Sequence, residues 1–371
     1  MITSTLQHAA YMQKALELAN QSLCTATPNP RVGCVLVNDQ GDIVGQGFHA
    51  RAGLPHAETM ALQQAGKHAE NTTAYINLEP CAHHGRTPPC CEALVQAGVK
   101  QVVIPFLDPD PRVSGLGMEY LQMHGVDVVV GVLKEQAWEL NKGFLQRIEK
   151  NRPWLRLKLA MSLDARTAMA SGESQWISCE TSREEVQHWR AQSCAVVTGI
   201  GTVLLDNPSM NVRLANTTRQ PVRIIVDTHL RTLPEAKILT LAGETVIVTC
   251  QTDRAKYSAL LDAGAIIKVL PANTQGQVDL PALVAYLAER QFNDVWFEAG
   301  TILSGALLQA HCVDELIVYI APKLLGHDAR AMMQLPGLDK LKNAVQFEFS
   351  EVVKVGVDLR LTARIHEHFR R

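Results

Sequence analysis

Four residues in the first hundred positions have the types and spacing to do metal chemistry. His56 and Glu58 stand two residues apart in the run Pro55-His56-Ala57-Glu58, and Cys81 and Cys90 each follow a proline. One imidazole and two thiolates provide three of the four ligands of tetrahedral zinc and leave the fourth position for water. Zinc lowers the pKa of its water to about 7, and Glu58 could carry the released proton to a leaving amine. These residues predict a zinc-dependent hydrolytic deamination.

Each of these residues also has an ordinary explanation. A His-x-Glu pair at a helix start is usually a solvated or capping arrangement, and a single buried cysteine usually belongs to the core. Both groups, however, stand at expected strand and helix ends, and His-x-Glu followed by Pro-Cys and a second cysteine is typical of zinc-dependent base deaminases. In the common form the second cysteine comes three residues after the first. Here the polar and cationic segment 82–89 intervenes, which would suit recognition of a substrate phosphate.

Local signals for chemistry are weaker in the second half of the chain. Lys158 lies in an alternating stretch that predicts an ordinary half-exposed strand when taken alone. The run Glu298-Ala299-Gly300-Thr301 predicts a strand that leads through a glycine turn into a helix, whose first N–H groups could hold a pyrophosphate. This run is not a G-x-G-x-x-G fingerprint, so it does not indicate a Rossmann domain.

Short β-rich stretches alternate with helical ones along the chain, which predicts α/β sheets covered by helices on both faces. The charged segment Glu149-Lys150-Asn151-Arg152-Pro153 interrupts this pattern, so we expect one domain at residues 1–150 and a second at 151–371. In the first domain we expect an amphipathic helix within 1–20, strands at 32–37, 43–48, 73–78, 101–105 and 126–130, and helices at 57–67, 90–97, 117–124 and 134–147. In the second we expect strands at 154–162, 195–198, 222–227, 245–250, 266–270, 294–298, 315–320 and near 352–361, and helices at 184–192, 254–263, 280–290 and 302–309.

Length and composition limit the possible functions. The 371 residues, 47% hydrophobic and 19% charged, suffice for two or three cored domains and exclude disorder as the general description. The formal net charge of -2 argues against nucleic acid or a membrane surface as a partner, but it is compatible with a small phosphorylated ligand. Nine cysteines, an odd number, argue against a disulfide framework, and the N-terminus does not resemble a signal peptide. We therefore expect a cytoplasmic protein.

Several motifs together resemble one known family, the bifunctional riboflavin-biosynthesis deaminase/reductases. In the first half they are Thr27-Pro28-Asn29-Pro30-Arg31-Val32-Gly33-Cys34-Val35, His49, Pro55-His56-Ala57-Glu58, Leu78-Glu79-Pro80-Cys81, His84-Gly85-Arg86-Thr87-Pro88-Pro89-Cys90, Asp108-Pro109-Asp110-Pro111 and Leu140-Asn141-Lys142-Gly143-Phe144. In the second half the segments 157–159, 162–164, 171–178, 198–203, 206–208 and 298–300 are similar to the reductase part of that family. The resemblance covers essentially the whole chain. The long spacing between the two cysteines is the normal form in this family.

For the first domain, the resemblance implies a cytidine-deaminase-like α/β/α fold and zinc held by His56, Cys81 and Cys90, with Glu58 as the proton carrier. The substrate would be a 2,5-diamino-6-ribosylamino-pyrimidinone 5'-phosphate, whose ring amine is hydrolysed to a carbonyl. The residues implied to contact the pyrimidine and its ribose phosphate are Asn29, His49, His83 and Arg86.

For the second domain, the resemblance implies a dihydrofolate-reductase-like α/β fold that uses NADPH to reduce the opened ribosyl group to ribityl. The implied cofactor-binding residues are Ala160, Trp176, Thr202, Asp206, Thr228, Gly300, Thr301, Ile302, Leu303, Ser304, Gly305 and Ala306. The residues implied to lie against the substrate are the catalytic Lys158 together with Ser174, Arg190, Met210, Arg213 and Glu298. Arg190 and Arg213 suit this role because a guanidinium matches the oxygens of a phosphate.

Two positions depart from the pattern of the family. Ala165 follows the aspartate where glycine is usual, which argues against a turn with positive φ there. Asn211 stands where threonine is usual before Val212-Arg213, which puts the local substrate contacts in question.

Two alternatives remain open at this point. A nucleic-acid base deaminase with a substrate-presenting second domain would use the same zinc chemistry but would need a basic face. The second domain could also be a ligand-sensing module without catalytic activity, which would not oxidise NADPH. By analogy with the family we expect a homodimer or a larger homo-oligomer that acts on a small phosphorylated pyrimidine.

Overall fold

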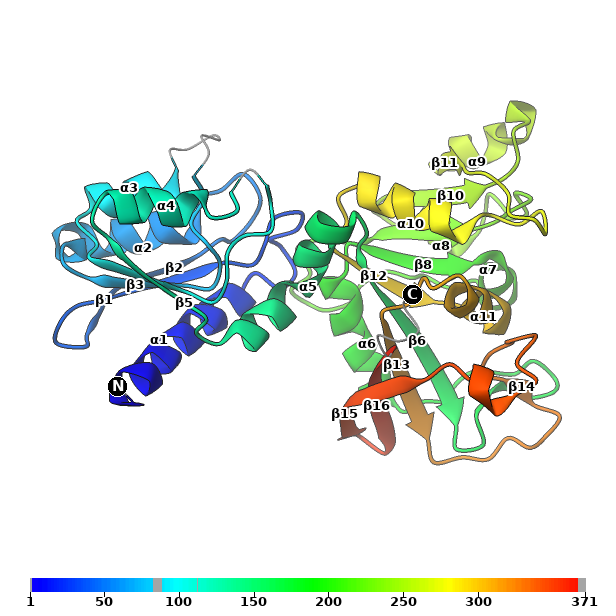
Figure 1. The fold of residues 1–371 in the computed structure, drawn as a ribbon. Helices are drawn as coiled ribbons and strands as arrows, with labels where there is room; N and C mark the ends of the chain where they lie inside the picture. The colour runs from blue at the N-terminus through cyan, green and yellow to red at the C-terminus, as the bar shows by residue number, and fades with distance from the viewer. Residues whose placement is uncertain (1, 83–88, 112, 366–371) are drawn as a thin grey trace. The chain divides into compact units, whose positions relative to one another are not determined.

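The computed structural model describes residues 2–82, 89–111 and 113–365. Within it the chain divides into two compact units, Met1–Asn151 and Arg152–Arg371, which appear in blue to green and in green to red in Figure 1. Among the described residues, no helix combines the length and the hydropathy needed to cross a membrane.

The first unit is built on a mixed five-stranded sheet with the order β2-β1-β3-β4-β5. Strand β1 is antiparallel to both of its neighbours, whereas β3, β4 and β5 run parallel. The strands are β1 (Gly33–Val37), β2 (Ile43–Phe48), β3 (Thr73–Ile76), β4 (Gln101–Ile104) and β5 (Asp127–Val130). The helices are α1 (Ile2–Asn20), α2 (Ala57–Ala65), the 3-10 helix η1 (Gly66–Ala69), α3 (Cys90–Gln96), α4 (Leu116–Met123) and α5 (Lys134–Lys150).

Helices cover both faces of this sheet, as the alternation in the sequence predicted (Figure 1). On one face α2, α3 and α4 bury Ala61, Leu94 and Leu121 against the sheet. On the other face α1 and α5 bury Met12 and Ala137. The result is a three-layer α/β/α unit, with one apolar cluster on each side of the strands.

A glycine in β2 sets how closely α2 approaches the sheet. A Cβ atom at Gly47 would lie 2.5 Å from Cβ of Met60 and 2.6 Å from the carbonyl oxygen of Ala57. No larger residue fits there without moving the first turn of α2. Because His56 is the N-cap of this helix and Glu58 lies in its first turn, the same contact positions the His-x-Glu pair.

The second unit contains a nine-stranded sheet with the order β11-β10-β9-β8-β12-β6-β13-β16-β15 and a two-stranded ribbon of β7 and β14. The strands from β11 to β13 in this order are parallel, and β16 and β15 continue the sheet in antiparallel fashion. The strands are β6 (Trp154–Ser162), β7 (Arg166–Ala168), β8 (Ala195–Gly199), β9 (Val222–Val226), β10 (Thr245–Thr249), β11 (Ile266–Val269), β12 (Asp294–Glu298), β13 (Glu315–Ala321), β14 (Arg330–Ala331), β15 (Phe347–Val355) and β16 (Asp358–Ile365).

Helices again pack on both faces of the large sheet. Leu283 of α10 and Leu307 of α11 belong to one apolar cluster, and Val186 of α6, Val203 of α7 and Ile238 of α8 belong to a second. The helices are α6 (Glu180–Gln192), α7 (Ile200–Asp206), α8 (Lys237–Thr240), η2 (Arg254–Lys256), α9 (Ser258–Asp262), α10 (Leu280–Glu289), α11 (Thr301–Gln309) and η3 (Leu341–Asn343). Since β6, β8, β9 and β12 are parallel, their carboxyl ends meet at one edge, where open α/β sheets bind ligands.

The C-terminal part of the sheet differs from the sequence prediction. A single strand near 352–361 was expected, but the structure forms a hairpin of β15 and β16 with a turn through Gly356, whose φ is +61°. Strand β15 lies at the edge of the sheet and is exposed over most of its length, so it lacks the buried alternation that marks a strand in a sequence. The short elements α7, α8, β7 and β14 were also not predicted, and α5 continues to Lys150, within the segment taken as a linker.

The backbone at Ala165 corrects a second expectation. Its φ is +58°, so the turn after Asp164 adopts the left-handed conformation without a glycine. The N–H of Ala165 donates to the carbonyl of Ser162 (3.0 Å), and its carbonyl accepts from the N–H of Met332 (3.1 Å). The neighbouring Asp164 accepts N–H bonds from Leu325 and Gly326. These bonds hold a conformation that costs an alanine about 1 kcal/mol.

We therefore predict that Ala165→Gly raises the unfolding free energy of the second unit by about 0.5–1 kcal/mol, because glycine adopts positive φ without the steric cost of a Cβ atom. Denaturant unfolding followed by tryptophan fluorescence measures this, since four of the five tryptophans lie beyond residue 152. Ala170→Gly, at a nearby exposed turn position with ordinary φ, is the control and should be neutral or destabilising. Destabilisation by Ala165→Gly would contradict the proposed strain.

Candidate active sites

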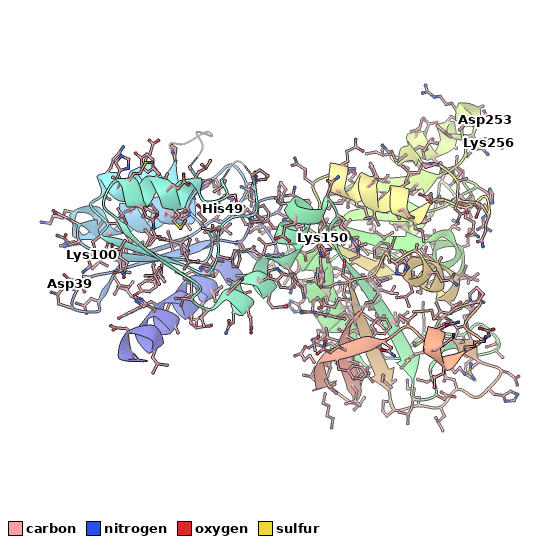
Figure 2. The ribbon with its side chains drawn as sticks, in the orientation of Figure 1. Asp39, His49, Lys100, Lys150, Asp253 and Lys256 are labelled. Atoms are coloured by element: carbon pink, nitrogen blue, oxygen red, sulfur yellow. The ribbon has the colours of Figure 1, made fainter. Side chains whose placement is uncertain are left out.

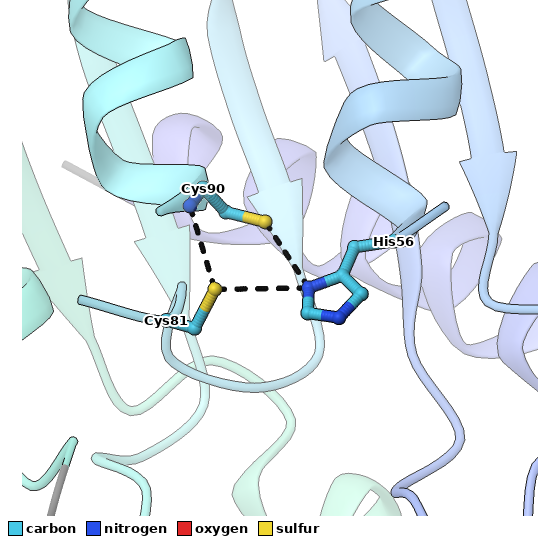
Figure 3. A group of neighbouring side chains, drawn as sticks. All are labelled: His56, Cys81 and Cys90. Carbon is cyan, nitrogen blue, oxygen red and sulfur yellow. Dashed lines mark hydrogen bonds between the residues drawn. The ribbon is translucent and has the colours of Figure 1, made fainter. Parts of the chain in front are cut away.

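His56, Cys81 and Cys90 come together at one end of the first unit. His56 caps α2, Cys90 begins α3, and Cys81 lies in the segment that follows β3. Nδ1 of His56 is 3.3 Å from Sγ of Cys90 and 3.7 Å from Sγ of Cys81. Dashed lines in Figure 3 mark these two contacts. One ligand atom from each of the three residues lies within 4.8 Å of the others.

These spacings fit a tetrahedral zinc ion. Zinc–nitrogen and zinc–sulfur bonds of about 2.1 and 2.3 Å imply a nitrogen-to-sulfur separation of about 3.6 Å in a tetrahedral site. The two separations in the structure lie on either side of that value. Two thiolates would also balance the double charge of the ion, so the donor set suits zinc in charge as well as in geometry.

The two thiols interact with each other and with the imidazole. A hydrogen bond from Cys90 is the largest influence lowering the pKa of Cys81, with further bonds from His56 and the N–H of Cys90, although burial opposes the change. The pKa of Cys90 is correspondingly raised, first by its bond to Cys81 and then by burial. The bond to Cys81 also raises the pKa of His56. The imidazole and the neighbouring thiol therefore favour the charged, thiolate form of Cys81.

Glu58 is buried beside this cluster. Its side chain is 3% exposed, and its Oε2 atom has no hydrogen-bond partner among the described residues. Burial raises the pKa of Glu58, and the negative charge of Cys81 adds to this effect. A buried carboxylate with a raised pKa and an oxygen without a hydrogen bond is suited to accept a proton and return it.

Asn29 and His49 form a polar pair next to His56. Nδ2 of Asn29 lies 3.0 Å from Nε2 of His49, and Nδ1 of His49 lies 3.2 Å from the carbonyl oxygen of Pro55. A carbonyl can only accept, so Nδ1 of His49 carries the proton and Nε2 accepts from the amide of Asn29. The rings of His49 and His56 meet edge to face with centroids 5.4 Å apart, and His49 is labelled in Figure 2. Burial lowers the pKa of His49, which favours this neutral form.

Two other predicted substrate contacts, His83 and Arg86, lie outside the described residues. They belong to the segment between the two cysteines, for which the sequence suggested phosphate recognition.

In the sequence, Glu79 was noted only as part of the motif Leu78-Glu79-Pro80-Cys81, but in the structure its carboxylate helps to hold the site together. Its oxygens accept N–H bonds from Asp108 (2.9 Å), Gly115 (3.0 Å) and Met118 (3.0 Å). The side chain is 4% exposed. Glu79 thus ties the loop before α4 to the segment that carries Cys81, two residues further along. A buried acid directly before Pro-Cys was the only sequence signal for this role.

The second unit contains a cavity of about 710 Å³ at the carboxyl edge of its parallel strands. This volume lies within the usual range for small-molecule sites. The predicted cofactor and substrate residues that line the cavity are Lys158, Ala160, Ser174, Thr202, Asp206, Thr228, Glu298, Gly300, Thr301, Ile302, Leu303 and Ala306. Where a Cβ would stand at Gly201 there is open space, and at Gly300 the nearest atom is 3.8 Å away, so both backbones are accessible to a pyrophosphate.

The other predicted residues of this unit do not line the cavity. Trp176 is 63% exposed, and its ring lies under the guanidinium of Arg183 at 4.7 Å. Ser304 and Gly305 face the interior, where a Cβ at Gly305 would lie 1.7 Å from the carbonyl oxygen of Gln334. The remaining three, Arg190, Met210 and Arg213, lie close to Glu298 but do not line the cavity.

Arg190 is engaged by a carboxylate. Its Nε and an Nη donate to the two oxygens of Glu298 at 2.6 and 2.8 Å, and its other Nη donates to the carbonyl of Asn211 (3.0 Å). Burial alone would raise the pKa of Glu298, but Arg190, Lys158 and the indole N–H of Trp296 together lower it to about 2. Arg213 is exposed, and one Nη donates to the side chain of Asn211 (3.1 Å). Of the two arginines predicted to bind phosphate, Arg213 is therefore the accessible one.

Lys158 stands opposite Glu298 across the β6–β12 pair. Burial lowers the pKa of Lys158, and the charge of Arg190 adds to that effect, whereas the charge of Glu298 opposes it. The cavity is thus lined by a fixed carboxylate and by an amine that gives up its proton more readily than a solvated lysine.

Several lining residues were not identified from the sequence. They come from loops far apart along the chain and carry no local motif: Arg231, Asn273, Gln277, Arg330, Met332 and Gln334. Only the folding of the sheet brings these loops to the same edge.

Comparison with known proteins shows to which family the chain belongs. Residues 5–105 match the model of the cytidine and deoxycytidylate deaminase zinc-binding region, and residues 153–361 match that of the RibD C-terminal domain. The riboflavin biosynthesis protein RibD of Escherichia coli is 48% identical over 96% of this chain and 99% of its own, and that of Haemophilus influenzae is 45% identical over 98% of each chain. The chain belongs to the RibD family.

Solved structures agree with this assignment. One form of Acinetobacter baumannii RibD has a TM-score of 0.89 at 43% identity, covering 98% of this chain and 100% of its own. A Thermotoga maritima protein described as a diaminohydroxyphosphoribosylaminopyrimidine deaminase and 5-amino-6-(5-phosphoribosylamino)uracil reductase has a TM-score of 0.87 at 30% identity, covering 98% and 100%.

Membership of the RibD family confirms the predicted cytidine-deaminase-like and reductase folds, and the chain is a bifunctional riboflavin-biosynthesis enzyme with zinc and NADPH as cofactors. The alternative of a nucleic-acid base deaminase is not favoured, because the relatives match over the full length. A purely ligand-sensing second domain is likewise disfavoured by the match to the RibD C-terminal domain.

We predict that Glu79→Ala lowers the unfolding free energy of the first unit by about 2–4 kcal/mol, because it leaves three backbone N–H groups without their acceptor. It should also weaken zinc binding, measured by competition with a chromogenic chelator, because the segment bearing Cys81 loses its anchor. Glu119→Ala, at an exposed position of α4, is the matched control and should change neither quantity. Unchanged zinc affinity in Glu79→Ala would contradict the positioning role.

Proposed function

We propose that the first unit carries out the deamination and the second unit the reduction, with the boundary near residue 151. The observation that carries the first assignment is the cluster of His56, Cys81 and Cys90 with the buried, partly unpaired carboxylate of Glu58 beside it. The observation that supports the second is the cavity lined by the neighbouring Lys158 and Glu298.

For deamination, we propose that His56, Cys81 and Cys90 hold zinc. When bound, zinc would lower the pKa of a coordinated water and so make a nucleophile available at neutral pH. Glu58 would accept the proton that this water loses and transfer it to the ring amine, which leaves as ammonia while the ring carbon becomes a carbonyl. Asn29 and His49, already oriented by their mutual hydrogen bond, would contact the pyrimidine. His83 and Arg86 are proposed for the ribose phosphate.

For reduction, we propose that NADPH lies along the cavity with its pyrophosphate near Gly300 and Thr301. NADPH, when bound, supplies a hydride to the carbon of the opened ribosyl group. A proton must reach the heteroatom bonded to that carbon, and Lys158 is placed to donate it from its ammonium group. Glu298, held anionic by Arg190, would orient the substrate through its hydroxyl groups, and the exposed Arg213 would meet the phosphate.

The substrate class for both steps is a small phosphorylated pyrimidine, a 2,5-diamino-6-ribosylamino-pyrimidinone 5'-phosphate for the first step. We also propose a cytoplasmic location, a homodimer or larger homo-oligomer, and no nucleic-acid partner. Sedimentation of the purified protein tests the oligomeric state. Titration with RNA and DNA at low salt tests whether the protein binds nucleic acid.

We predict that the purified protein contains about one zinc per chain and that Glu58→Gln keeps the metal but loses at least 100-fold in deamination, because the amide cannot carry the proton. Zinc is measured by atomic emission and deamination by mass spectrometry of the diamino substrate. Glu119→Gln is the control, with no change in either. Normal deamination by Glu58→Gln would mean that another group transfers the proton.

We predict that Lys158→Ala lowers the rate of reduction by roughly 100-fold or more and leaves deamination unchanged, because only the second site loses its proton donor. NADPH oxidation with the deaminated substrate measures the first activity. Lys237→Ala, an exposed lysine of α8 outside the cavity, should affect neither step. Loss of both activities in Lys158→Ala would contradict two independent sites.

A further inference from the structure

The cavity of the second unit carries few charged groups. Its charged lining residues are Lys158, Asp206, Arg231, Glu298 and Arg330. Lys158 and Glu298 face each other at the end where reduction is proposed. Two arginines therefore remain for the phosphate groups of a dinucleotide, and neither was singled out by the sequence.

Arg231 lines the cavity at a distance of several strands from Lys158. It follows β9, and the sheet order places β8 and β12 between β9 and β6, the strand of Lys158. Three strand spacings of about 4.8 Å separate the two strands by roughly 14 Å. A dinucleotide whose nicotinamide lies near Lys158 would extend its adenosine toward Thr228 and Arg231.

The turn that carries Arg231 is held in place by buried bonds. The carboxylate of Asp227 is fully buried, and one oxygen accepts both the N–H (2.7 Å) and the hydroxyl (2.8 Å) of Thr232. The hydroxyl of Thr228 accepts the N–H of Val278 (3.3 Å), and its carbonyl accepts the hydroxyl of Thr249 (2.9 Å). Arg231 thus projects from a turn anchored on both sides, and a group presented this way loses less freedom on binding a ligand.

The chemistry of this turn favours a phosphate over a hydroxyl. In Rossmann-type dinucleotide sites, an acidic residue that hydrogen-bonds the ribose 2'-hydroxyl selects NAD, whereas a nearby arginine accommodates the 2'-phosphate of NADP. The same charge argument applies to any site that holds the adenosine ribose, because it depends only on the group placed beside the 2' position. Here the acid at the strand end, Asp227, is fully buried and does not line the cavity. One of its oxygens accepts both bonds from Thr232, and the other is buried without a partner among the described residues. Arg231 lines the cavity, is exposed, and makes no hydrogen bond or ion pair within the described parts of the chain.

Arg330 is the other possible partner for this phosphate. It comes from β14 and lies close enough to Asp206 for their charges to interact. That carboxylate offsets part of its charge, whereas Arg231 forms no ion pair with a carboxylate among the described residues. Arg231 is consequently the better receptor for a dianionic group.

We propose that Arg231 binds the 2'-phosphate of the cofactor and thereby makes the reductase select NADPH over NADH. The proposal rests on the proposed reductase function of this cavity. A guanidinium can bind two phosphate oxygens at once with paired N–H donors, which an ammonium group cannot do with the same geometry.

Equilibrium binding tests this without turnover. Calorimetry compares 2',5'-ADP with 5'-AMP, and NADPH with NADH. Each pair differs only in the 2'-phosphate, so the comparison separates the contribution of this phosphate to the binding affinity from that of the remaining parts of the ligand. In Arg231→Ala we expect 2',5'-ADP and NADPH to bind about 10- to 100-fold more weakly, which is roughly 1.4–2.7 kcal/mol, while 5'-AMP and NADH are unchanged. Arg231→Lys should bind 2',5'-ADP and NADPH with affinities between those of the wild type and Arg231→Ala, because it keeps the charge but loses the paired donors.

The control is Arg254→Ala, which removes one exposed arginine from η2. Asp253 and Lys256, labelled in Figure 2, mark its place at the outer tip of the second unit, and Arg254 does not line the cavity. It should leave all four affinities unchanged, and deamination should be normal in every variant.

The proposal is overturned if Arg231→Ala binds 2',5'-ADP as tightly as the wild type, if it loses 5'-AMP affinity equally, or if Arg330→Ala shows the selective loss instead. A wild-type protein that binds no dinucleotide at all would overturn the reductase assignment itself, and this proposal with it. Those two failures are distinguishable, because the first leaves wild-type binding of NADPH intact.

Discussion

Both candidate sites depend on one constraint, namely that strand ends and helix starts meet at one edge of a sheet. In the first unit, Cys81 follows β3 while His56 and Cys90 begin two helices packed on the strands. In the second, parallel pairing brings Lys158 of β6 opposite Glu298 of β12, with Gly300 capping the next helix. Backbone N–H groups at helix starts and strand-end side chains are the available polar groups at such an edge, so ligand chemistry concentrates there.

Two buried glutamates show how the surroundings decide what a carboxylate does. Glu58 is buried with one oxygen unpaired, and burial raises its pKa toward the range in which a proton can be exchanged. Glu298 is buried against the paired donors of Arg190 and near Lys158, which hold its pKa at about 2. The same side chain thus suits proton transfer in one site and fixed negative charge in the other.

Two further buried acids position the chain. Glu79 binds three backbone N–H groups and thereby joins the loop before α4 to the segment of Cys81. Asp227 binds Thr232 twice and fixes the turn of Arg231. Each lies a few residues from a group assigned to ligand binding. In both units a buried carboxylate therefore fixes the backbone next to a residue proposed to bind a ligand.

Sequence alone determined the alternation of strands and helices and the cluster of His56, Cys81 and Cys90, because hydrophobic periodicity and the His-x-Glu and Pro-Cys motifs are local in the chain. The resemblance of these and further motifs to a known family implied the fold of each half. Most predicted strands agree with the structure within one or two residues. The tertiary structure alone decided the exposed hairpin of β15 and β16, the left-handed turn at Ala165, the pairing of Arg190 with Glu298, and the place of Arg231 in the cavity. Each of these features depends on contacts between segments far apart in the sequence or on hydrogen bonds that outweigh a local conformational preference. Contacts and bonds of this kind leave no periodic pattern in the sequence.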